Sequence, residues 1–183
     1  MARWGFGSSR YGPFGWCRVG KVTDLVVALG LLGLIVIAGA AVIHRLGPAR
    51  TLAGHAVAID GDSLRLAGEE LRLEGLDALE YRQSCRRREG GEVACGRMAR
   101  SALARLIASG ELRCTVGRAD RYGRGLARCV AGETDVNAAM VREGHAVAFG
   151  DYAREERQAK ASQRGIWAYD FEAPADWRRR QGR

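Results

Sequence analysis

Residues 55–80 read HAVAIDGDSLRLAGEELRLEGLDALE and indicate the fold class of the chain. Apolar and polar residues alternate within short runs, and Asp-Gly or Gly-containing turns separate the runs. Alternation with a period of two, bounded by tight turns, is typical of antiparallel strands that bury one face. The stretch therefore predicts three short strands, at residues 55–59, 63–66 and 71–76.

The residues that follow change between the helical and the strand period. An apolar stripe at helical spacing precedes Gly110, and Asp135 is a suitable N-cap for a helix that Gly144 ends. The sequence predicts a loop over 81–92, helices over 96–109, 135–142 and 152–164, a hairpin of 112–116 with 126–130, and a strand over 146–149. Five or so short strands with interspersed helices favour a small β-barrel that carries helices, an α+β fold, over a doubly wound sheet.

A separate hydrophobic segment precedes this domain. Residues 25–43 contain no charge, and a helix of 19 residues is roughly 28 Å long, close to the ~30 Å hydrocarbon core of a bilayer. We expect a retained transmembrane signal anchor. The alternative is a signal peptide cleaved after the small residues 38–40, although the 24 residues before the run are long for the charged region of such a peptide.

The flanking charges predict the orientation of this segment. The basic residues before it are Arg3, Arg10, Arg18 and Lys21. Only Arg45 and Arg50 follow it closely, so the positive-inside rule places the N-terminus in the cytoplasm, with Phe14 and Trp16 at the membrane interface. The folded domain then lies on the periplasmic side of the inner membrane, or is secreted if the segment is cleaved. We divide the chain into a cytoplasmic tail (1–24), a transmembrane helix (25–43), a linker (44–53), the folded domain (54–177) and a basic tail (178–183).

The net charge of +8 is shared unevenly along the chain. Residues 1–50 contribute +5 of it and the remaining residues +3. The folded domain is therefore only mildly basic, which suits transient contact with a polyanion better than tight storage of nucleic acid.

Four of the five cysteines lie beyond the hydrophobic segment. An even number in an oxidising compartment indicates disulfides. Of the three pairings, we expect Cys85–Cys95, which closes a short polar loop, and Cys114–Cys129, which links the two strands around residues 120–124. Zinc binding is the alternative, but the C-x2-C spacing of zinc sites is absent.

Acidic residues end two of the predicted strands. The block Asp60-Gly61-Asp62-Ser63 joins the first two strands, and Asp77 follows the third. Asp-Gly is a very common turn dipeptide, so the first block taken alone is a plain hairpin turn. Two carboxylates at adjacent strand ends can share a cation, however, and ligation by oxygen alone suits calcium or magnesium.

Three further charged residues complete a set suited to cleaving a phosphodiester. Glu80 can remove a proton from water beside a metal ion. The guanidinium of Arg124, between Gly123 and Gly125, can bind two phosphate oxygens at once. Arg72 alternates with leucines on its strand, and on pattern alone it is a solvated arginine.

The blocks DGDS, RLEGLDALE, DRYGRGLA and GIWAYDFEAPADW occur in this order. On these blocks, from about His55 to Trp177, the chain resembles the staphylococcal nuclease (thermonuclease) family. The resemblance implies an OB-fold, a five-stranded barrel with about three helices. It also implies a calcium-dependent endonuclease that hydrolyses DNA and RNA and leaves 3′-phosphate and 5′-hydroxyl ends.

The resemblance also assigns roles to individual positions. The implied catalytic residues are Arg72, Glu80 and Arg124. The implied Ca²⁺ ligands are Asp62, Asp77 and the backbone carbonyl of Ala78, with Asp60 and Ser63 beside them. The implied nucleotide-binding residues are Arg121 and Tyr122 at a terminal phosphate and Phe149 at the base. Because such a site contacts phosphates and a splayed base, we expect a preference for single-stranded or frayed nucleic acid. We also expect a monomer.

Two positions depart from the pattern of the family. Ser63 replaces the usual threonine and keeps the hydroxyl, whereas Leu79 replaces a proline that fixes φ. We therefore expect Glu80 to be less rigidly placed and the enzyme to be slower. The alternatives are a non-catalytic nucleic-acid- or protein-binding module and a membrane-tethered assembly protein whose barrel is only a scaffold.

Overall fold

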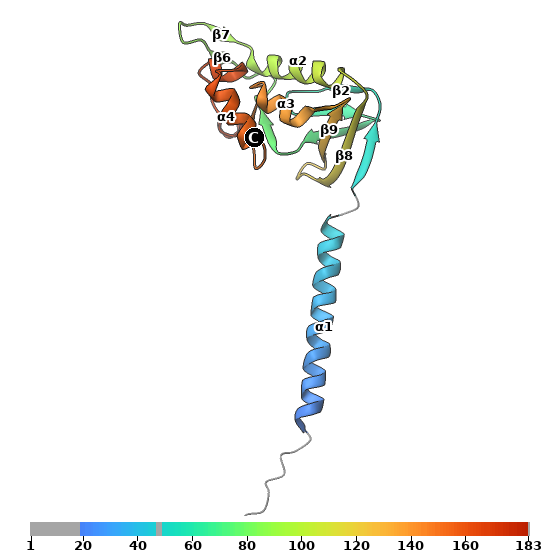
Figure 1. The fold of residues 1–183 in the computed structure, drawn as a ribbon. Helices are drawn as coiled ribbons and strands as arrows, with labels where there is room; N and C mark the ends of the chain where they lie inside the picture. Colours follow the sequence, from blue (N-terminus) through green and yellow to red (C-terminus); the bar gives the residue numbers. More distant parts are fainter. Residues whose placement is uncertain (1–18, 47–48, 183) are drawn as a thin grey trace, which may run out of the picture. The chain divides into compact units, whose positions relative to one another are not determined.

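A computed structural model describes residues 19–46 and 49–182, with side chains over 24–40 and 49–182. The chain forms two compact units, Met1–Arg45 and Leu46–Arg183. The first contains helix α1 (Val19–Leu46) (Figure 1). Among the helices over the described residues, none is both long and apolar enough to cross a membrane. Most of the expected cytoplasmic tail, including Phe14 and Trp16, and the side chains of residues 41–43 lie outside the described residues.

The second unit is built on a curled seven-stranded sheet. Its strands follow the order β1-β8-β9-β4-β3-β2, with β10 paired to β9. The strands are β1 (Arg50–Ala53), β2 (Ala56–Ala58), β3 (Ser63–Leu66), β4 (Glu69–Leu73), β8 (Leu112–Ala119), β9 (Gly125–Ala131) and β10 (Thr134–Asp135). The pairs β2–β3, β3–β4 and β8–β9 are antiparallel, as the alternating pattern predicts, whereas β4 and β9 are parallel.

Helices and two small sheets pack beside this main sheet (Figure 1). Strand β5 (Leu76–Ala78) pairs with β11 (Ala146–Ala148), and β6 (Cys85–Arg86) pairs with β7 (Glu92–Val93). The helices are α2 (Cys95–Ile107), α3 (Val136–Arg142), α4 (Ala153–Ala161), the 3₁₀ turn η1 (Gly165–Ala168) and α5 (Pro174–Arg180). Asp135 caps α3 as expected, because its carboxylate accepts a hydrogen bond from the Ala138 N–H.

One apolar core lies between the main sheet and helices α2 and α3. Leucines of β3 and β4 point into it, including the fully buried Leu64, Leu71 and Leu73. A second, smaller cluster joins Leu79, Ile166 and the Cys85–Cys95 disulfide. Both expected disulfides, Cys85–Cys95 and Cys114–Cys129, are confirmed.

The structure corrects the sequence analysis in several places. Residues 50–53, expected in the linker, form β1 because the long strand β8 offers them a free edge. The sheet has seven strands, not five, and no pairing between its edge strands β1 and β2 closes a barrel within the described residues. The loop over 81–92 contains the β6–β7 hairpin. Residues 178–180, expected in a basic tail, continue helix α5.

Candidate active site

A groove with a volume of about 1540 Å³ gathers most of the candidate residues. It is lined by Asp60, Arg72, Asp77, Glu80, Arg121, Tyr122, Arg124 and Phe149. Asp62 and Ser63 lie beneath it and contact Arg72 and Arg124. Arg124 therefore lies on the same face of the sheet as the carboxylates of Asp62 and Asp77. A smaller cavity of about 590 Å³ between β2 and α2 contains none of the candidate residues.

Asp62 lies in the turn between β2 and β3 and is almost fully buried. Its backbone N–H donates to Asp60 Oδ1 at 3.0 Å, which fixes the turn. Gly61 is required here, because a Cβ at this position would lie 2.6 Å from the Ala78 Cβ and 2.7 Å from the Ala99 Cβ. The close approach brings Asp62 Oδ2 within 3.0 Å of the Ala78 N–H.

The buried position of Asp62 changes its acidity. Burial, together with the nearby carboxylates of Asp60 and Asp77, raises the pKa of Asp62 to about 7, although Arg72 and the Ala78 N–H act in the opposite direction. Burial of this carboxylate, the largest cause, thus outweighs the opposite effect of the Arg72 guanidinium on its pKa.

Arg72 connects the two carboxylates. Its Nη1 donates to Asp62 Oδ1 at 2.8 Å, and its Nη2 donates to Asp77 Oδ1 at 2.7 Å. The side chain is only 20% exposed, so the interpretation as a solvated arginine is wrong. The alternation of β4 explains the geometry, because Leu71 and Leu73 point into the core and Arg72 points to the opposite face.

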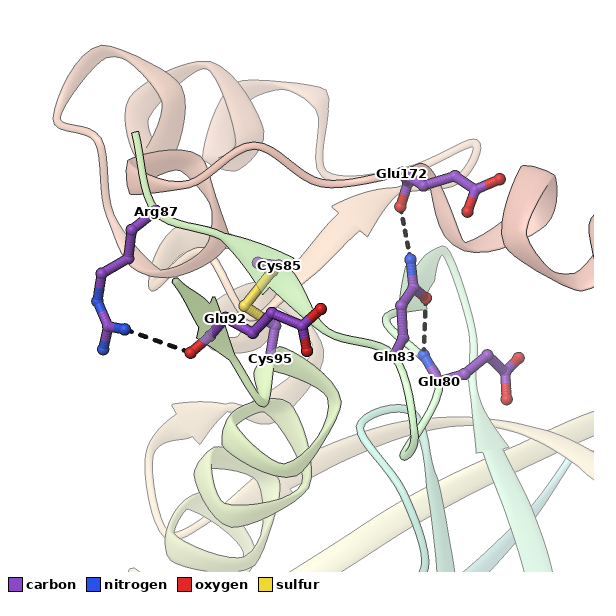
Figure 2. Close-up of a disulfide and its surroundings, with 7 residues drawn as sticks. All are labelled: Glu80, Gln83, Cys85, Arg87, Glu92, Cys95 and Glu172. Carbon is purple, nitrogen blue, oxygen red and sulfur yellow. Dashed lines mark hydrogen bonds between the residues drawn. A yellow bond between two sulfur atoms is a disulfide. The ribbon is translucent and has the colours of Figure 1, made fainter. Parts of the chain in front are cut away.

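The loop after β5 holds Glu80 through its backbone (Figure 2). The Gln83 Oε1 atom accepts a hydrogen bond from the Glu80 N–H at 3.2 Å, and the Gln83 Nε2 atom donates to the Glu172 carbonyl at 2.7 Å. The N-terminus of α2 packs against the same loop, and a Cβ at Gly96 would lie 1.8 Å from the Glu80 carbonyl oxygen. Leu79 is fully buried beside the Cys85–Cys95 disulfide. The leucine that stands in place of the family proline therefore packs into the core beside this loop.

Arg124 is oriented by the turn that carries it. Asp120 Oδ2 accepts from Arg124 Nε at 2.9 Å, and Asp120 Oδ1 accepts from the backbone N–H groups of Tyr122 and Arg124. Although burial acts in the opposite direction, these bonds lower the pKa of Asp120. Arg124 Nη1 also donates to the Ser63 hydroxyl at 3.3 Å, so the hydroxyl has a structural role in the site. The contact between Asp120 and Arg124 could have been predicted from the sequence, because an aspartate often accepts hydrogen bonds from backbone N–H groups a few residues later in a turn.

Two exposed aromatic rings flank the basic residues of the groove. Tyr122 is 65% exposed, and the guanidinium of Arg121 lies 4.7 Å from the centre of its ring. Phe149 is 72% exposed, and its backbone N–H donates to the Gly75 carbonyl at 2.9 Å. Exposed aromatic faces beside guanidinium groups can stack on bases while the cations contact phosphates.

Arg178, which the sequence analysis places in the basic tail, also lines the groove. Arg178 of α5 donates from Nη2 to Asp77 Oδ2 at 2.7 Å, and from Nη1 to Asp77 Oδ1 and Glu80 Oε1, both at 3.0 Å. Its hydrogen bonds to Asp77 and Glu80 raise the pKa of Arg178. In the sequence Arg178 belongs to a run of three arginines near the end of the chain, which is usually solvated, so the pattern carried no signal for this contact.

The donor set of the site suits a hard cation, although it is small. Asp62 and Asp77 are buried and offer only oxygen, which calcium and magnesium prefer. Among the described residues no group of three or more His, Cys, Asp or Glu side chains could hold a metal ion. A cation here would therefore need backbone carbonyl, water or phosphate oxygens in addition.

Comparisons with known proteins point to one family. A family model described as "Staphylococcal nuclease homologue" matches residues 70–169, a range that ends before α5. The succinoglycan biosynthesis protein ExoI of Rhizobium meliloti (strain 1021) is 37% identical over 157 residues, which cover 82% of this chain and 79% of that protein. The probable staphylococcal-like nucleases CAN3 and CAN2 of Oryza sativa subsp. japonica are 34% and 32% identical over 116 residues, 60% of this chain and 28% and 29% of theirs.

Proposed function

Because this chain belongs to the staphylococcal nuclease family, we propose that it is an endonuclease that hydrolyses phosphodiester bonds of DNA and RNA and leaves 3′-phosphate ends. The observation that carries the proposal is the convergence of Arg72, Asp77, Glu80 and Arg124 on one groove. These residues come from different strands and loops. An arrangement of two guanidinium groups, buried carboxylates and a more exposed glutamate is what phosphodiester hydrolysis requires.

We propose Ca²⁺ as the cofactor of this reaction, with the Asp62 and Asp77 carboxylates and the Ala78 carbonyl as protein ligands. The all-oxygen donor set and the burial of both carboxylates support this assignment. Calcium bound at this position would polarise a phosphoryl oxygen and neutralise charge that develops on it.

The side chains of the protein then divide the remaining tasks. Glu80, whose backbone is fixed by Gln83, accepts a proton from the attacking water. Arg72 and Arg124 donate hydrogen bonds to the phosphoryl oxygens as negative charge increases on them. Arg121, Tyr122 and Phe149 bind the nucleotide, and their exposure favours single-stranded or frayed substrates.

The decisive experiment replaces the proposed base. Glu80→Gln should lower the cleavage rate of denatured DNA in calcium by about 10²–10⁴-fold, while the affinity for a single-stranded oligonucleotide changes little. Glu70→Gln is a matched control, since Glu70 is an exposed glutamate that lines the same groove. A chelator should abolish cleavage by the wild type. Wild-type turnover in Glu80→Gln would remove Glu80 from the base role.

A second function is favoured by two specific observations. The relative from Rhizobium meliloti is named a biosynthesis protein, and Arg178 occupies both oxygens of Asp77 in the present chain. The alternative is a non-catalytic module that binds nucleic acid or protein. Oligonucleotide binding without cleavage, in calcium and at full occupancy, would establish it in place of the nuclease.

We also propose that residues 25–43 anchor the chain in the inner membrane, with the folded unit on the periplasmic side. The uncharged run and its basic N-terminal flank support the anchor. The two disulfides support an oxidising compartment for the folded unit. We propose a monomer.

A further inference from the structure

Arg178 occupies positions on both oxygens of Asp77 at which a bound cation could lie. Its guanidinium donates to both oxygens of Asp77, at 3.0 Å for Oδ1 and 2.7 Å for Oδ2. Asp77 Oδ1 also accepts from Arg72 at 2.7 Å. A carboxylate oxygen has two acceptor positions, so Oδ1 of Asp77 is saturated by the two guanidinium groups.

Helix α5 is held over the site by contacts on both sides of its N-terminus. The Glu172 carbonyl, just before the helix, accepts from the buried Gln83 side chain (Figure 2). Pro174 is buried in the first turn, where its fixed φ favours helix initiation. Arg178 is itself only 26% exposed. The contact of Arg178 with Asp77 therefore belongs to an ordered element.

Arg178 and Arg72 already neutralise part of the negative charge to which a cation at Asp77 would bind. Three carboxylates, Asp62, Asp77 and Glu80, share the two guanidinium groups of Arg72 and Arg178. A divalent ion that approaches Asp77 meets both positive groups within hydrogen-bond distance of the same carboxylate. Repulsion between charges at such short separations is strong in a partly buried site.

We propose that Arg178 is an internal competitor of the divalent cation at Asp77, and that it sets the affinity of the site for that cation. The inference rests on the proposed calcium site. Calcium then gains the positions on the Asp77 oxygens that Arg178 now occupies only when the guanidinium leaves them. The C-terminal helix, beyond the residues that match the family model, then tunes a site built by the rest of the fold.

The test measures calcium binding directly and needs no catalysis. Isothermal titration of the full chain with CaCl₂ compares the wild type with Arg178→Gln, Arg178→Lys and Arg179→Gln. Arg179 is a matched control, since it is the next residue of the same helix, is exposed and pairs with Asp176. Thermal unfolding of each variant reports whether it folds.

The expected result is calcium affinity at least about ten-fold higher in Arg178→Gln than in the wild type, with Arg179→Gln unchanged. Arg178→Lys should give a smaller gain, because a lysine keeps the charge but cannot donate to both oxygens as a fork. If Arg178→Gln does not fold, the gain in Arg178→Lys decides the question.

Several results would overturn the inference. They are equal or weaker calcium binding by the Arg178 variants, an equal gain in Arg179→Gln, and no calcium binding by any of the four proteins. If Arg178→Gln binds calcium and the other proteins do not, the result supports the competition. It contradicts the proposal that the wild-type enzyme depends on calcium. Cleavage by the wild type with an unchanged isotherm in Arg178→Gln leaves the proposed function intact and removes only this inference.

Discussion

At the scale of single residues, Asp62 couples the pH of the solution to the stability of the site. Its pKa of about 7 in the folded protein lies above the ordinary value of 3.8. Between these pH values the folded state keeps a proton that the unfolded state has released. The contribution of Asp62 to the free energy of unfolding therefore falls as the pH rises from about 4 to about 7.

Bound calcium should restore part of the free energy of unfolding that is lost when Asp62 ionises. A ligand carboxylate must be ionised, so calcium competes with the proton on Asp62 below pH 7. We predict that saturating calcium raises the Tm of the full chain more at pH 8 than at pH 5.5, measured by calorimetry. Asp62→Asn is the control. It has no titrating group at this position, so the difference between the rises in Tm at the two pH values should disappear. An equal rise at both pH values would contradict calcium ligation by Asp62.

Gln83 is a buried amide whose two ends hold two segments of the site together. Its Oε1 accepts from the Glu80 N–H and its Nε2 donates to the Glu172 carbonyl. We predict that Gln83→Ala lowers the free energy of unfolding by about 1–3 kcal/mol, since two buried polar groups lose their partners. Cleavage should also fall, because the backbone of Glu80 is released.

The control for this variant is Gln158→Ala on the exposed face of α4. Urea unfolding and initial cleavage rates should both stay within error of the wild type in the control. Normal cleavage by a destabilised Gln83→Ala would show that the loop holds Glu80 without the amide.

At the scale of elements, the two disulfides allow an effect on stability to be distinguished from an effect on the geometry of the site. Cys114–Cys129 joins the central strands β8 and β9, and Cys85–Cys95 joins the loop after Glu80 to the start of α2. Their loops, with sequence separations of 15 and 10, should each contribute about 3 kcal/mol to the free energy of unfolding.

The effects on cleavage should differ between the two bridges. We predict that a Cys85→Ser/Cys95→Ser double variant loses cleavage activity at temperatures where it remains folded. Cys114→Ser/Cys129→Ser should lose stability to a similar degree while keeping its kcat. Guanidinium unfolding and cleavage rates measure the two effects. The same activity in both double variants would exclude a role for Cys85–Cys95 in placing Glu80.

At the scale of the whole molecule, the proposed anchor makes a prediction about fractionation. The full chain should sediment with membranes, resist a high-salt wash and dissolve in detergent, and N-terminal sequencing should find residues 1–24 still attached. Leu34→Arg, at the centre of the uncharged run, should weaken insertion, because a charge there costs about 2.5–3.5 kcal/mol. An N-terminus shortly after Ala40 would show that the segment is a cleaved signal peptide.

The sequence by itself determined the parts of this protein that depend on neighbours along the chain. Alternating leucines fixed the faces of β3 and β4, and hence the side to which Arg72 points. The turn at residues 120–124 fixed Arg124, because Asp120 reaches it only four residues away. The positions of the cysteines relative to a short loop and a predicted hairpin led to both disulfide pairs, and the motifs led to the family. Hydrogen bonds over a few residues and the period of apolar side chains depend only on residues that are close in the sequence.

Only the tertiary structure decided which distant segments meet. Arg178 reaches Asp77 and Glu80 across 101 and 98 positions, and Gln83 reaches Glu172 across 89. The edge strand β1 and the parallel pairing of β4 with β9 likewise depend on where the sheet curls. Such contacts form because burial of the core brings the segments together, and their polar groups then form hydrogen bonds with one another. A single sequence holds no periodic signal for a partner a hundred residues away.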